Sequence, residues 1–337
     1  MIDTQKLEST AKALVAQGKG ILAADESNGT CNKRFESVGA PTTEDSRRAY
    51  RELLFTTPES KQFLSGVILY DETIRQSASN GMPFAQMLAG AGIIPGIKVD
   101  KGTVALPNSP EEKMTEGLDG LRQRLAEYVA MGAGFTKWRS VITIGENMPT
   151  DACVRANADT LAMYALLAQE AGLVPIIEPE VILDGTHGIA RAESVTQKTL
   201  ETVFASMASY GVYLPGLILK TSMVVPGKGS GETMVATDVA ERTARVLKSV
   251  VPSECGGVVF LSGGQTPAQA AENLSEITKR GPYPWGVTFS YARALQEPAL
   301  AAWAGKNENV SAAQTAFAKR LTLAGAALSG TYATSME

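Results

Sequence analysis

The chain has 337 residues, of which 44% are hydrophobic and 20% are charged, a composition that is ordinary for a globular protein. Its 31 basic and 35 acidic residues give a net charge of −4, which argues against a nucleic-acid partner. The apolar runs are far too short to span a bilayer, and the N-terminus lacks the basic start and apolar core of a signal peptide, so we expect a cytoplasmic protein with no membrane partner.

Short β-rich runs alternate with longer helical segments along the chain. The eight strand candidates are Gly20–Ala24, Gly66–Tyr70, Ile93–Val99, Gly134–Arg139, Val174–Pro179, Leu214–Thr221, Gly257–Ser262 and Trp285–Ser290. The predicted helices are Glu44–Phe55, Thr115–Met131, Asp151–Ala171, Ala192–Tyr210, Thr237–Val250, Pro267–Lys279 and Ser311–Leu328. This spacing leaves room in each unit for a strand, a helix and two loops.

The alternation of strands and helices predicts the fold class, α/β. It implies a parallel sheet, and eight units close naturally into a (β/α)8 TIM barrel, although a doubly wound open sheet follows the same pattern. No linker or shift in composition marks a second domain. We therefore predict one barrel domain over residues 1–337. It carries a short C-terminal tail, about residues 329–337, whose simplest interpretation is a disordered terminus.

The rare residues exclude several kinds of catalytic site. Cys31, Cys153 and Cys255 are scattered and form no CxxC motif, so neither a disulfide framework nor a thiolate metal site is expected. His187 is the single histidine, whereas a catalytic zinc usually takes two or three imidazoles. We expect no metal and no cofactor. An enzyme of this composition would draw its nucleophiles and proton carriers mainly from Lys, Glu, Asp and Tyr.

Charged residues interrupt the apolar runs where the strand candidates end. They are Asp25, Glu26, Asp71, Glu72, Lys98, Asp100, Lys137, Arg139, Glu178, Glu180, Lys220 and Arg293. Residues i and i+2 of a strand point the same way, so Lys137 shares a face with Arg139. The same holds for Glu178 and Glu180. One charged residue at a strand end is usually a solvated edge, but a full ring at the carboxyl ends of barrel strands predicts an active site.

Lys220 follows the apolar run Leu217-Ile218-Leu219. Burying an unpaired ammonium costs several kcal/mol, so this lysine should shift its pKa or have a charged partner. Lowering its pKa from about 10.4 by about three units, through desolvation and neighbouring cations, would free the amine as a nucleophile. The alternative is a lysine that merely reaches solvent at the barrel rim. The second lysine and the paired glutamates favour a Schiff base.

A phosphate-binding signature lies near the end of the chain. Ser262-Gly263-Gly264 ends a strand and precedes the helix that opens at Pro267, so backbone N–H groups and a hydroxyl are available to an anion. Arg293 follows the last strand and can add a fork of donors. The alternative is a plain glycine turn. Barrels often bind phosphate after strands seven and eight, which favours a phosphate site here.

Seven ordered motifs together resemble the class I, or Schiff-base, fructose-bisphosphate aldolases. The motifs are Leu22-Ala23-Ala24-Asp25-Glu26-Ser27, Gly96-Ile97-Lys98-Val99-Asp100, Lys137-Trp138-Arg139, Ile177-Glu178-Pro179-Glu180, the Lys220 strand, Leu261-Ser262-Gly263-Gly264 and Thr288-Phe289-Ser290-Tyr291. They run in register from about Gly18 to about Leu328. The resemblance implies a metal-independent carbon–carbon lyase of glycolysis and gluconeogenesis, which forms a homotetramer. Its substrate is a sugar bisphosphate, fructose 1,6-bisphosphate, which it cleaves reversibly to dihydroxyacetone phosphate and glyceraldehyde 3-phosphate.

The resemblance also implies a role for each matching residue. Lys220 would form the imine, and Glu178 would move protons while the carbinolamine loses water. Glu180 would orient Lys220 by a hydrogen bond. Lys137 would supply a second cation, and Asp25 would contact the hydroxyl beside the breaking bond. The implied phosphate-binding residues are Ser262, Gly263, Ser290 and Arg293 for one phosphate and Arg34, Lys98 and Arg139 for the other, with Gly264 and Thr30 as further substrate-binding residues.

The sequence departs from the family pattern in three places that bear on the site. Ala292 stands where the family commonly has glycine, so its side chain can crowd the phosphate loop. Thr30 replaces a frequent serine and keeps the hydroxyl. The tail lacks the terminal tyrosine to which the family owes a late proton transfer, and Tyr332 is a weak substitute.

Two alternatives to this aldolase stay open at the level of sequence. One is another Schiff-base barrel lyase or transferase that acts on sugar phosphates, and two phosphate-binding clusters rather than one argue against it. The other is a non-catalytic binding scaffold with a barrel fold. The ring of catalytic residue types at the strand ends argues against a scaffold.

Overall fold

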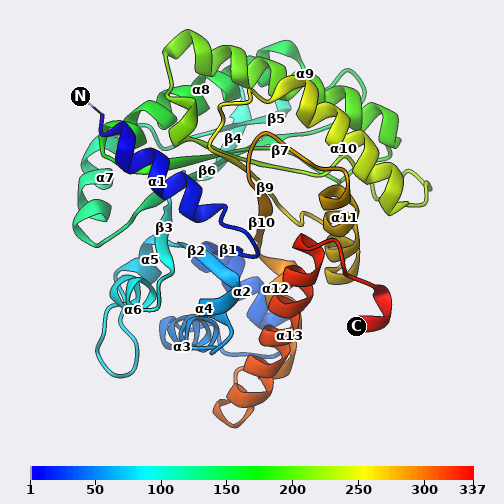
Figure 1. Ribbon diagram of the computed structural model, residues 1–337. Coiled ribbons are helices and arrows are strands. Elements are labelled where there is room, and N and C mark those ends of the chain that lie inside the picture. Colours follow the sequence, from blue (N-terminus) through cyan, green and yellow to red (C-terminus); the bar gives the residue numbers. More distant parts are fainter. Residues whose placement is uncertain (1) are drawn as a thin grey trace.

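Eight parallel strands close into a barrel in the computed structural model, which describes residues 2–337 (Figure 1). The strands are β1 (Gly20–Ala24), β2 (Leu64–Leu69), β3 (Ile94–Lys98), β6 (Phe135–Ile142), β7 (Val174–Val181), β8 (Ile218–Thr221), β9 (Gly257–Phe260) and β10 (Val287–Tyr291). Their order around the ring is β1-β10-β9-β8-β7-β6-β3-β2. Because β1 pairs with both β2 and β10, the sheet is closed, which confirms the predicted TIM barrel and excludes the open sheet.

Apart from α1, which precedes β1, the helices follow the strands, and most of them form the outer layer of the barrel (Figure 1). They are α1 (Thr4–Leu14), α2 (Asn28–Glu36), α3 (Glu44–Phe55), α4 (Ser60–Phe63), α5 (Asp71–Ile74), α6 (Phe84–Gly90), α7 (Leu121–Ala130), α8 (Asp151–Glu170), α9 (Ile189–Tyr210), α10 (Ala236–Val250), α11 (Pro267–Lys279), α12 (Arg293–Trp303) and α13 (Val310–Leu328). Helices α3 and α11 have the predicted bounds. The N-cap of α3 is Thr43, whose hydroxyl accepts a hydrogen bond from the backbone of Ser46 at 3.1 Å. Within residues 2–337 no helix is both long and apolar enough to cross a membrane.

The predicted helix over 115–131 differs from the structure. It begins only at Leu121, because Gly117 and Gly120 have φ values of 132° and 65°, which a helix excludes. An antiparallel hairpin precedes it, formed by β4 (Thr103–Leu106) and β5 (Ser109–Thr115). The strand–helix alternation did not predict this hairpin, which is inserted between β3 and α7.

The strand predicted over 214–221 is also shorter than expected. Leu214–Gly216 form a turn of 3-10 helix, and β8 begins at Ile218. The central residue of the turn is Pro215, which has no N–H group to donate to a sheet ladder. Lys220 nevertheless lies within β8, close to its carboxyl end.

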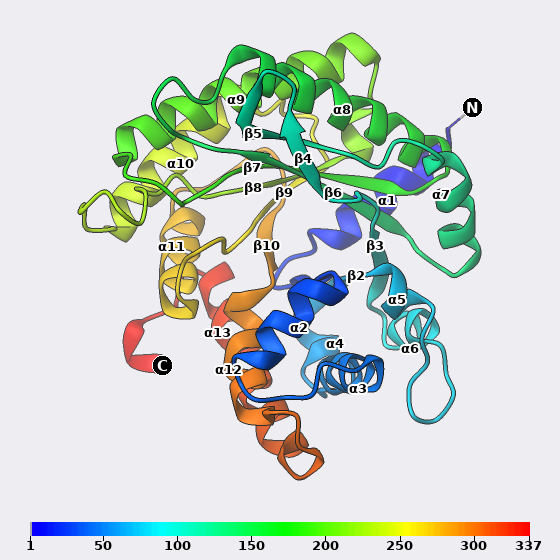
Figure 2. The ribbon, with the colours of Figure 1, turned by 180° about the vertical axis from the view of Figure 1, so that it is seen from behind.

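Helix α1 lies across one mouth of the barrel (Figure 1). Its Leu7 and Leu14 are fully buried and share a cluster with apolar side chains of the strands. The strand members of this cluster are Ile21, Ala23, Ile68, Phe135, Val174, Ile176, Ile218 and Val259. Seen from behind, α2 and the β4–β5 hairpin lie on the opposite side of the barrel from α1 (Figure 2). One mouth is therefore closed by apolar packing, and the carboxyl ends of the strands remain available for a site.

The C-terminal tail packs against the body through Tyr332, which is 7% exposed and joins the core between strands and helices. Its hydroxyl donates to Oε1 of Glu337 at 2.8 Å. Oε2 of Glu337 in turn accepts a hydrogen bond at 2.5 Å from Arg320, a buried residue of α13. These contacts hold the tail against the outer helical layer.

Candidate active site

A cavity of about 440 Å³ opens at the carboxyl ends of the strands. Every predicted site residue except Gly264 lines it. They are Asp25, Thr30, Arg34, Lys98, Lys137, Arg139, Glu178, Glu180, Lys220, Ser262, Gly263, Ser290 and Arg293. They come from seven of the barrel strands or from the loops and helices that follow them, so the closed barrel brings together residues that are up to 268 positions apart in the sequence, from Asp25 to Arg293. Tyr332 does not line the cavity.

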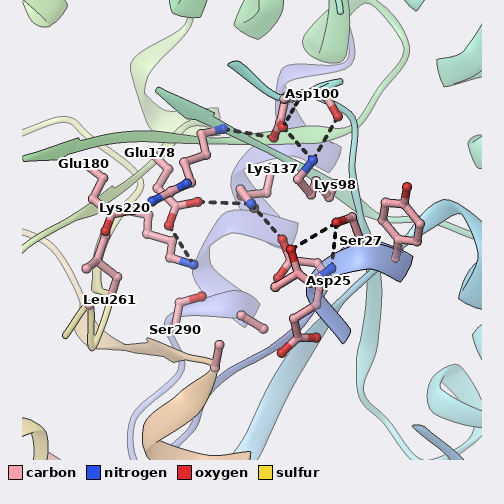
Figure 3. Close-up of a pocket in the computed structure, with 18 of the residues that line it drawn as sticks. Asp25, Ser27, Lys98, Asp100, Lys137, Glu178, Glu180, Lys220, Leu261 and Ser290 are labelled. Atoms are coloured by element: carbon pink, nitrogen blue, oxygen red, sulfur yellow. Dashed lines mark hydrogen bonds and ion pairs between the residues drawn. The ribbon is translucent and has the colours of Figure 1, made fainter. Parts of the chain in front are cut away.

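A chain of alternating charges crosses the floor of the cavity (Figure 3). Nζ of Lys220 lies 3.1 Å from Oε1 of Glu178, and the other oxygen of Glu178 lies 3.2 Å from Nζ of Lys137. Lys137 is also 2.7 Å from Oδ2 of Asp25. Both lysines are only 3% exposed. Two buried lysines thus share one carboxylate, and a second carboxylate contacts one of them.

The charges of this chain stabilise one another. Burial on its own would lower the pKa of Lys137, but Asp25 and Glu178 raise it well above its usual range. Burial would raise the pKa of Asp25, yet Lys137 and Lys220 hold it far below its usual range. Lys137 and Lys220 likewise lower the pKa of Glu178 in spite of its burial. Lys137, Asp25 and Glu178 are therefore charged at neutral pH.

Glu180 has a different partner from the one predicted. Its Oε2 accepts a hydrogen bond from Nε of Arg139 at 2.5 Å. Within residues 2–337, the carboxylate that pairs with Lys220 is Glu178. The structure therefore does not contain the predicted hydrogen bond between Glu180 and Lys220. The register of β7 and β8 explains the difference, because it puts Glu178 beside Lys220 and Glu180 two residues nearer the rim.

One end of the cavity presents polar groups that have no internal partner. The Ser290 hydroxyl on β10 is buried and has no hydrogen-bond partner among residues 2–337. Arg293, the first residue of α12, forms no ion pair with any described residue and faces the cavity. Ser262 and Gly263 lie beside them after β9. A hydroxyl, a guanidinium and a helix N-terminus together suit an anion.

Gly264 is the exception among the predicted phosphate-binding residues. Its φ is +75°, a conformation that favours glycine, and the position of its missing side chain is filled by Leu183 and Lys228 rather than by the cavity. Its positive φ lets it form the turn after β9, and it does not line the cavity. Its predicted part in binding phosphate stays a prediction.

The opposite end of the cavity carries three cations that each hold a carboxylate. Lys98 lies 2.6 Å from Asp100, and Arg139 pairs with Glu180. Arg34 on α2 pairs with Glu26. The strands β3 and β6, which carry Lys98 and Arg139, lie across the ring from β9 and β10. The two predicted anion-binding clusters are therefore at opposite ends of one cavity.

Several residues of the site were not predicted as such. Glu26 and Asp100 line the cavity as partners of its cations, and both had stood out only as charges at strand ends. Thr30 lies in the first turn of α2, with its hydroxyl 3.1 Å from that of Ser27, which is a further lining residue. The start of the β4–β5 hairpin, over 101–103, also lines the cavity and was missed because the hairpin itself was missed.

Comparison with known proteins identifies the family. The sequence model described as "Fructose-bisphosphate aldolase class-I" matches residues 6–337, almost the whole chain. The chain belongs to the class I fructose-bisphosphate aldolases. This result decides against the non-catalytic scaffold and against another Schiff-base lyase.

Two relatives and a solved structure are similar to this chain over most of their lengths. A Xanthomonas campestris protein named probable fructose-bisphosphate aldolase class 1 is 54% identical over 299 residues, which are 89% of this chain and 90% of that protein. The cytosolic fructose-bisphosphate aldolase 4 of Arabidopsis thaliana is 47% identical, over 95% of this chain and 82% of the relative. A Plasmodium falciparum fructose-bisphosphate aldolase, solved in complex with TRAP and a small-molecule inhibitor, superimposes with a TM-score of 0.96 at 45% identity, covering 98% and 95% of the two chains.

As a member of this family the aldolase reversibly cleaves fructose 1,6-bisphosphate to dihydroxyacetone phosphate and glyceraldehyde 3-phosphate. The class I reaction proceeds through a lysine Schiff base and belongs to glycolysis. The protonated imine accepts the electrons of the broken carbon–carbon bond, so the reaction needs no metal.

Proposed function

We propose that Lys220 is the lysine of this aldolase that forms the Schiff base. The observation that supports it is the 3.1 Å contact between its buried Nζ and Glu178, inside a cavity whose two ends suit two phosphates. A nucleophilic amine next to a group that can take its proton is the arrangement that covalent catalysis requires. Glu178 is itself held by Lys137, so its position is fixed before substrate arrives.

Glu178 moves the protons while the imine forms. It takes one proton from the Lys220 ammonium, and the free amine attacks the ketone carbon. The second proton passes from the attacking nitrogen to the ketone oxygen, which gives a carbinolamine. Glu178 then returns its proton to the carbinolamine hydroxyl, which leaves as water and produces the protonated imine. One ammonium and one ketone thus give one iminium and one water.

Asp25 and Lys137 serve the cleavage of the carbon–carbon bond. Asp25 accepts the proton of the hydroxyl beside the breaking bond, and the bonding electrons pass into the iminium to give an enamine. The pKa of Asp25 is far below its usual range because of Lys137 and Lys220, despite its burial, so it is ionised and able to accept this proton. Lys137 keeps its positive charge and stabilises negative charge that develops on the reacting oxygen.

The two ends of the cavity bind the two phosphates of the substrate. Strand β8, which carries Lys220, neighbours β9, so the Ser262, Ser290 and Arg293 end takes the phosphate on C1, one carbon from the ketone. The Arg34, Lys98 and Arg139 end takes the phosphate on C6. Binding energy from both phosphates positions the bond that breaks.

We further propose that the aldolase is a cytoplasmic homotetramer. The resemblance to the family supports the tetramer, and the Arabidopsis relatives named cytosolic support the compartment. Light scattering of the purified protein tests the assembly and should give four times the mass of the chain. A monomer or dimer at micromolar concentration would contradict it.

The Schiff base is tested by trapping it. Borohydride reduction in the presence of dihydroxyacetone phosphate, followed by peptide mapping, should place the covalent adduct on Lys220. The Lys220→Met variant should give no adduct and lose cleavage activity by at least roughly a thousandfold. EDTA should leave the wild-type rate unchanged. An adduct on another lysine, or cleavage that survives in Lys220→Met, would overturn the assignment.

A further inference from the structure

Arg51 of α3 is a buried charge beside the cavity that the mechanism does not use. Its side chain is 3% exposed and does not line the cavity. Its Nη2 lies 2.9 Å from Oε2 of Glu26, the one carboxylate that pairs with it among residues 2–337. Its Nε and Nη1 have no hydrogen-bond partner there. Burying an arginine with so few partners is costly, so packing alone does not account for its place here.

The Glu26 carboxylate is held from both sides. One oxygen faces Arg51, and the other accepts hydrogen bonds from Nη1 of Arg34 and, at 3.0 Å, from the amide of Gln296. Gln296 is 2% exposed and also donates to the Ala23 carbonyl at 2.7 Å, which ties it to β1. Arg51 and Gln296 therefore fix Glu26 from behind. Arg34, with 25% of its side chain exposed, is the cation of the group that reaches the cavity.

The net charge of Arg34, Glu26 and Arg51 together is positive only because Arg51 contributes to it. Arg34 and Glu26 alone sum to zero, because +1 and −1 cancel. With Arg51 the sum is +1. Although burial on its own would lower the pKa of the Arg51 guanidinium, Glu26 keeps it raised, so the charge is present. Charges a few ångströms apart in a partly buried site are little screened by salt.

We propose that Arg51 is a positioning residue that sets the charge of the Arg34 end of the cavity, where the C6 phosphate is proposed to bind. It neutralises Glu26 from behind, so that Arg34 is held in place by the carboxylate and still offers its positive charge to a phosphate. Arg51 itself never touches the substrate. This inference rests on the proposed binding of the C6 phosphate by the end of the cavity that contains Arg34.

The test compares two substrates that differ in the far phosphate. Fructose 1,6-bisphosphate carries it and fructose 1-phosphate does not. Arg51→Met should raise KM for the bisphosphate by about tenfold, because Glu26 then cancels Arg34, and should leave KM for fructose 1-phosphate within about twofold. Glu26→Gln should shift the ratio of the two KM values in the opposite direction, because Arg51 and Arg34 are then both uncompensated. If one variant fails to fold, the other still tests the sign.

The double variant Arg51→Met/Glu26→Gln separates charge from packing. It removes both charges behind Arg34, so KM for the bisphosphate should return toward the wild-type value. A merely structural role predicts instead that each single substitution raises KM for the bisphosphate and that the two increases add. The outcome that sinks the proposal is a KM for the bisphosphate in the double variant that is as high as in Arg51→Met, or higher.

Arg47 provides the matched control. It lies one turn earlier on α3 and forms a bidentate pair with Glu72, at 2.7 Å for both contacts, outside the cavity. Arg47→Met should lower the melting temperature without changing the ratio of the two KM values. The same ratio change in Arg47→Met as in Arg51→Met would mean that loosening α3 is the cause, which contradicts the proposal.

A separate variant distinguishes failure of this inference from failure of the assignment beneath it. Arg34→Met should remove much of the preference for the bisphosphate over fructose 1-phosphate. If it does not, the assignment of the C6 phosphate to Arg34 is wrong. If it does, but Arg51→Met changes both substrates equally, the inference about Arg51 alone is wrong.

Discussion

The two ends of the cavity both carry positive charge, but their cations differ in what they hold. At the β9–β10 end, Arg293 forms no ion pair within residues 2–337, and the buried Ser290 hydroxyl lacks a partner there. At the β3–β6 end, Lys98 lies 2.6 Å from Asp100 and Arg139 lies 2.5 Å from Glu180. The first end, which we call the open end, can accept an anion without losing an internal contact. At the second, the paired end, an incoming anion must share or replace a carboxylate that the cations already hold.

This difference predicts how each end responds to mutation. A phosphate at the open end gains charge-assisted hydrogen bonds without breaking internal ones. At the paired end, removing a cation leaves its carboxylate behind, unpaired and repelling the phosphate. Single substitutions at the paired end therefore measure two effects at once, and only double substitutions separate them.

The largest effect on substrate binding is expected at the open end. Arg293→Met should raise KM for both fructose 1,6-bisphosphate and fructose 1-phosphate by about 10- to 100-fold, because both substrates carry the C1 phosphate and each lost hydrogen bond to a charged group is worth about 1.5–3 kcal/mol. Steady-state kinetics with the two substrates measures this. A rise confined to the bisphosphate would move Arg293 to the other phosphate.

A smaller effect is expected at the paired end. Lys98→Met should raise KM for the bisphosphate by about tenfold and leave fructose 1-phosphate nearly unchanged. Adding Asp100→Asn should recover part of the loss, because the unpaired carboxylate is then gone. The double-mutant cycle is measured with the same two substrates. Strictly additive effects would show that Asp100 does not act as the internal counter-ion of Lys98.

The chain of alternating charges between the two ends should make the free energy of unfolding depend on pH in acid. The folded-state pKa of Asp25 lies below its ordinary value of 3.8, so its charge stabilises the fold above about pH 3.8, and this contribution is lost as the pH falls through the folded pKa. Below pH 4 the free energy of unfolding of the wild type should therefore fall more steeply with decreasing pH than that of Asp25→Asn, by up to about 1.4 kcal/mol per pH unit. Urea unfolding at a series of pH values measures both slopes. Equal slopes below pH 4 would mean that Asp25 is not held ionised by its lysines.

The barrel and the gathering of these residues around one cavity could be predicted because both depend on local patterns. Most strands are short apolar runs that end at or near a charged residue. The alternation of side chains along a strand already put Glu178 and Glu180 on one face. The ring of polar residues around the cavity could be predicted because closing the barrel brings the carboxyl ends of all its strands to one mouth.

The pairings inside the site could not be predicted, because they depend on how separate elements meet. Whether Lys220 contacts Glu178 or Glu180 is set by the register between β7 and β8, which neither strand specifies alone. The contact between Glu26 and Arg51 joins a loop to a helix 25 residues away and leaves no periodic signal. The Gly117 turn that displaces the start of α7 looks in sequence like a tolerated glycine in a helix.

The smallest effect is expected for Ala292, which tests how ready the open end is for an anion. Ala292 lines the cavity between Ser290 and Arg293 and packs partly buried against the inner barrel cluster. It is the N-cap of α12, with φ of −102° and ψ of −86°. Ala292→Gly should change the free energy of unfolding by less than about 1 kcal/mol, because glycine suits an N-cap position but loses more backbone entropy on folding. It should change KM for fructose 1-phosphate by less than about threefold, because the methyl group donates nothing to a phosphate. Thermal unfolding and kinetics measure the two. A KM that falls tenfold or more would show that the methyl group crowds the phosphate. Phosphate binding at the open end would then be limited by steric hindrance.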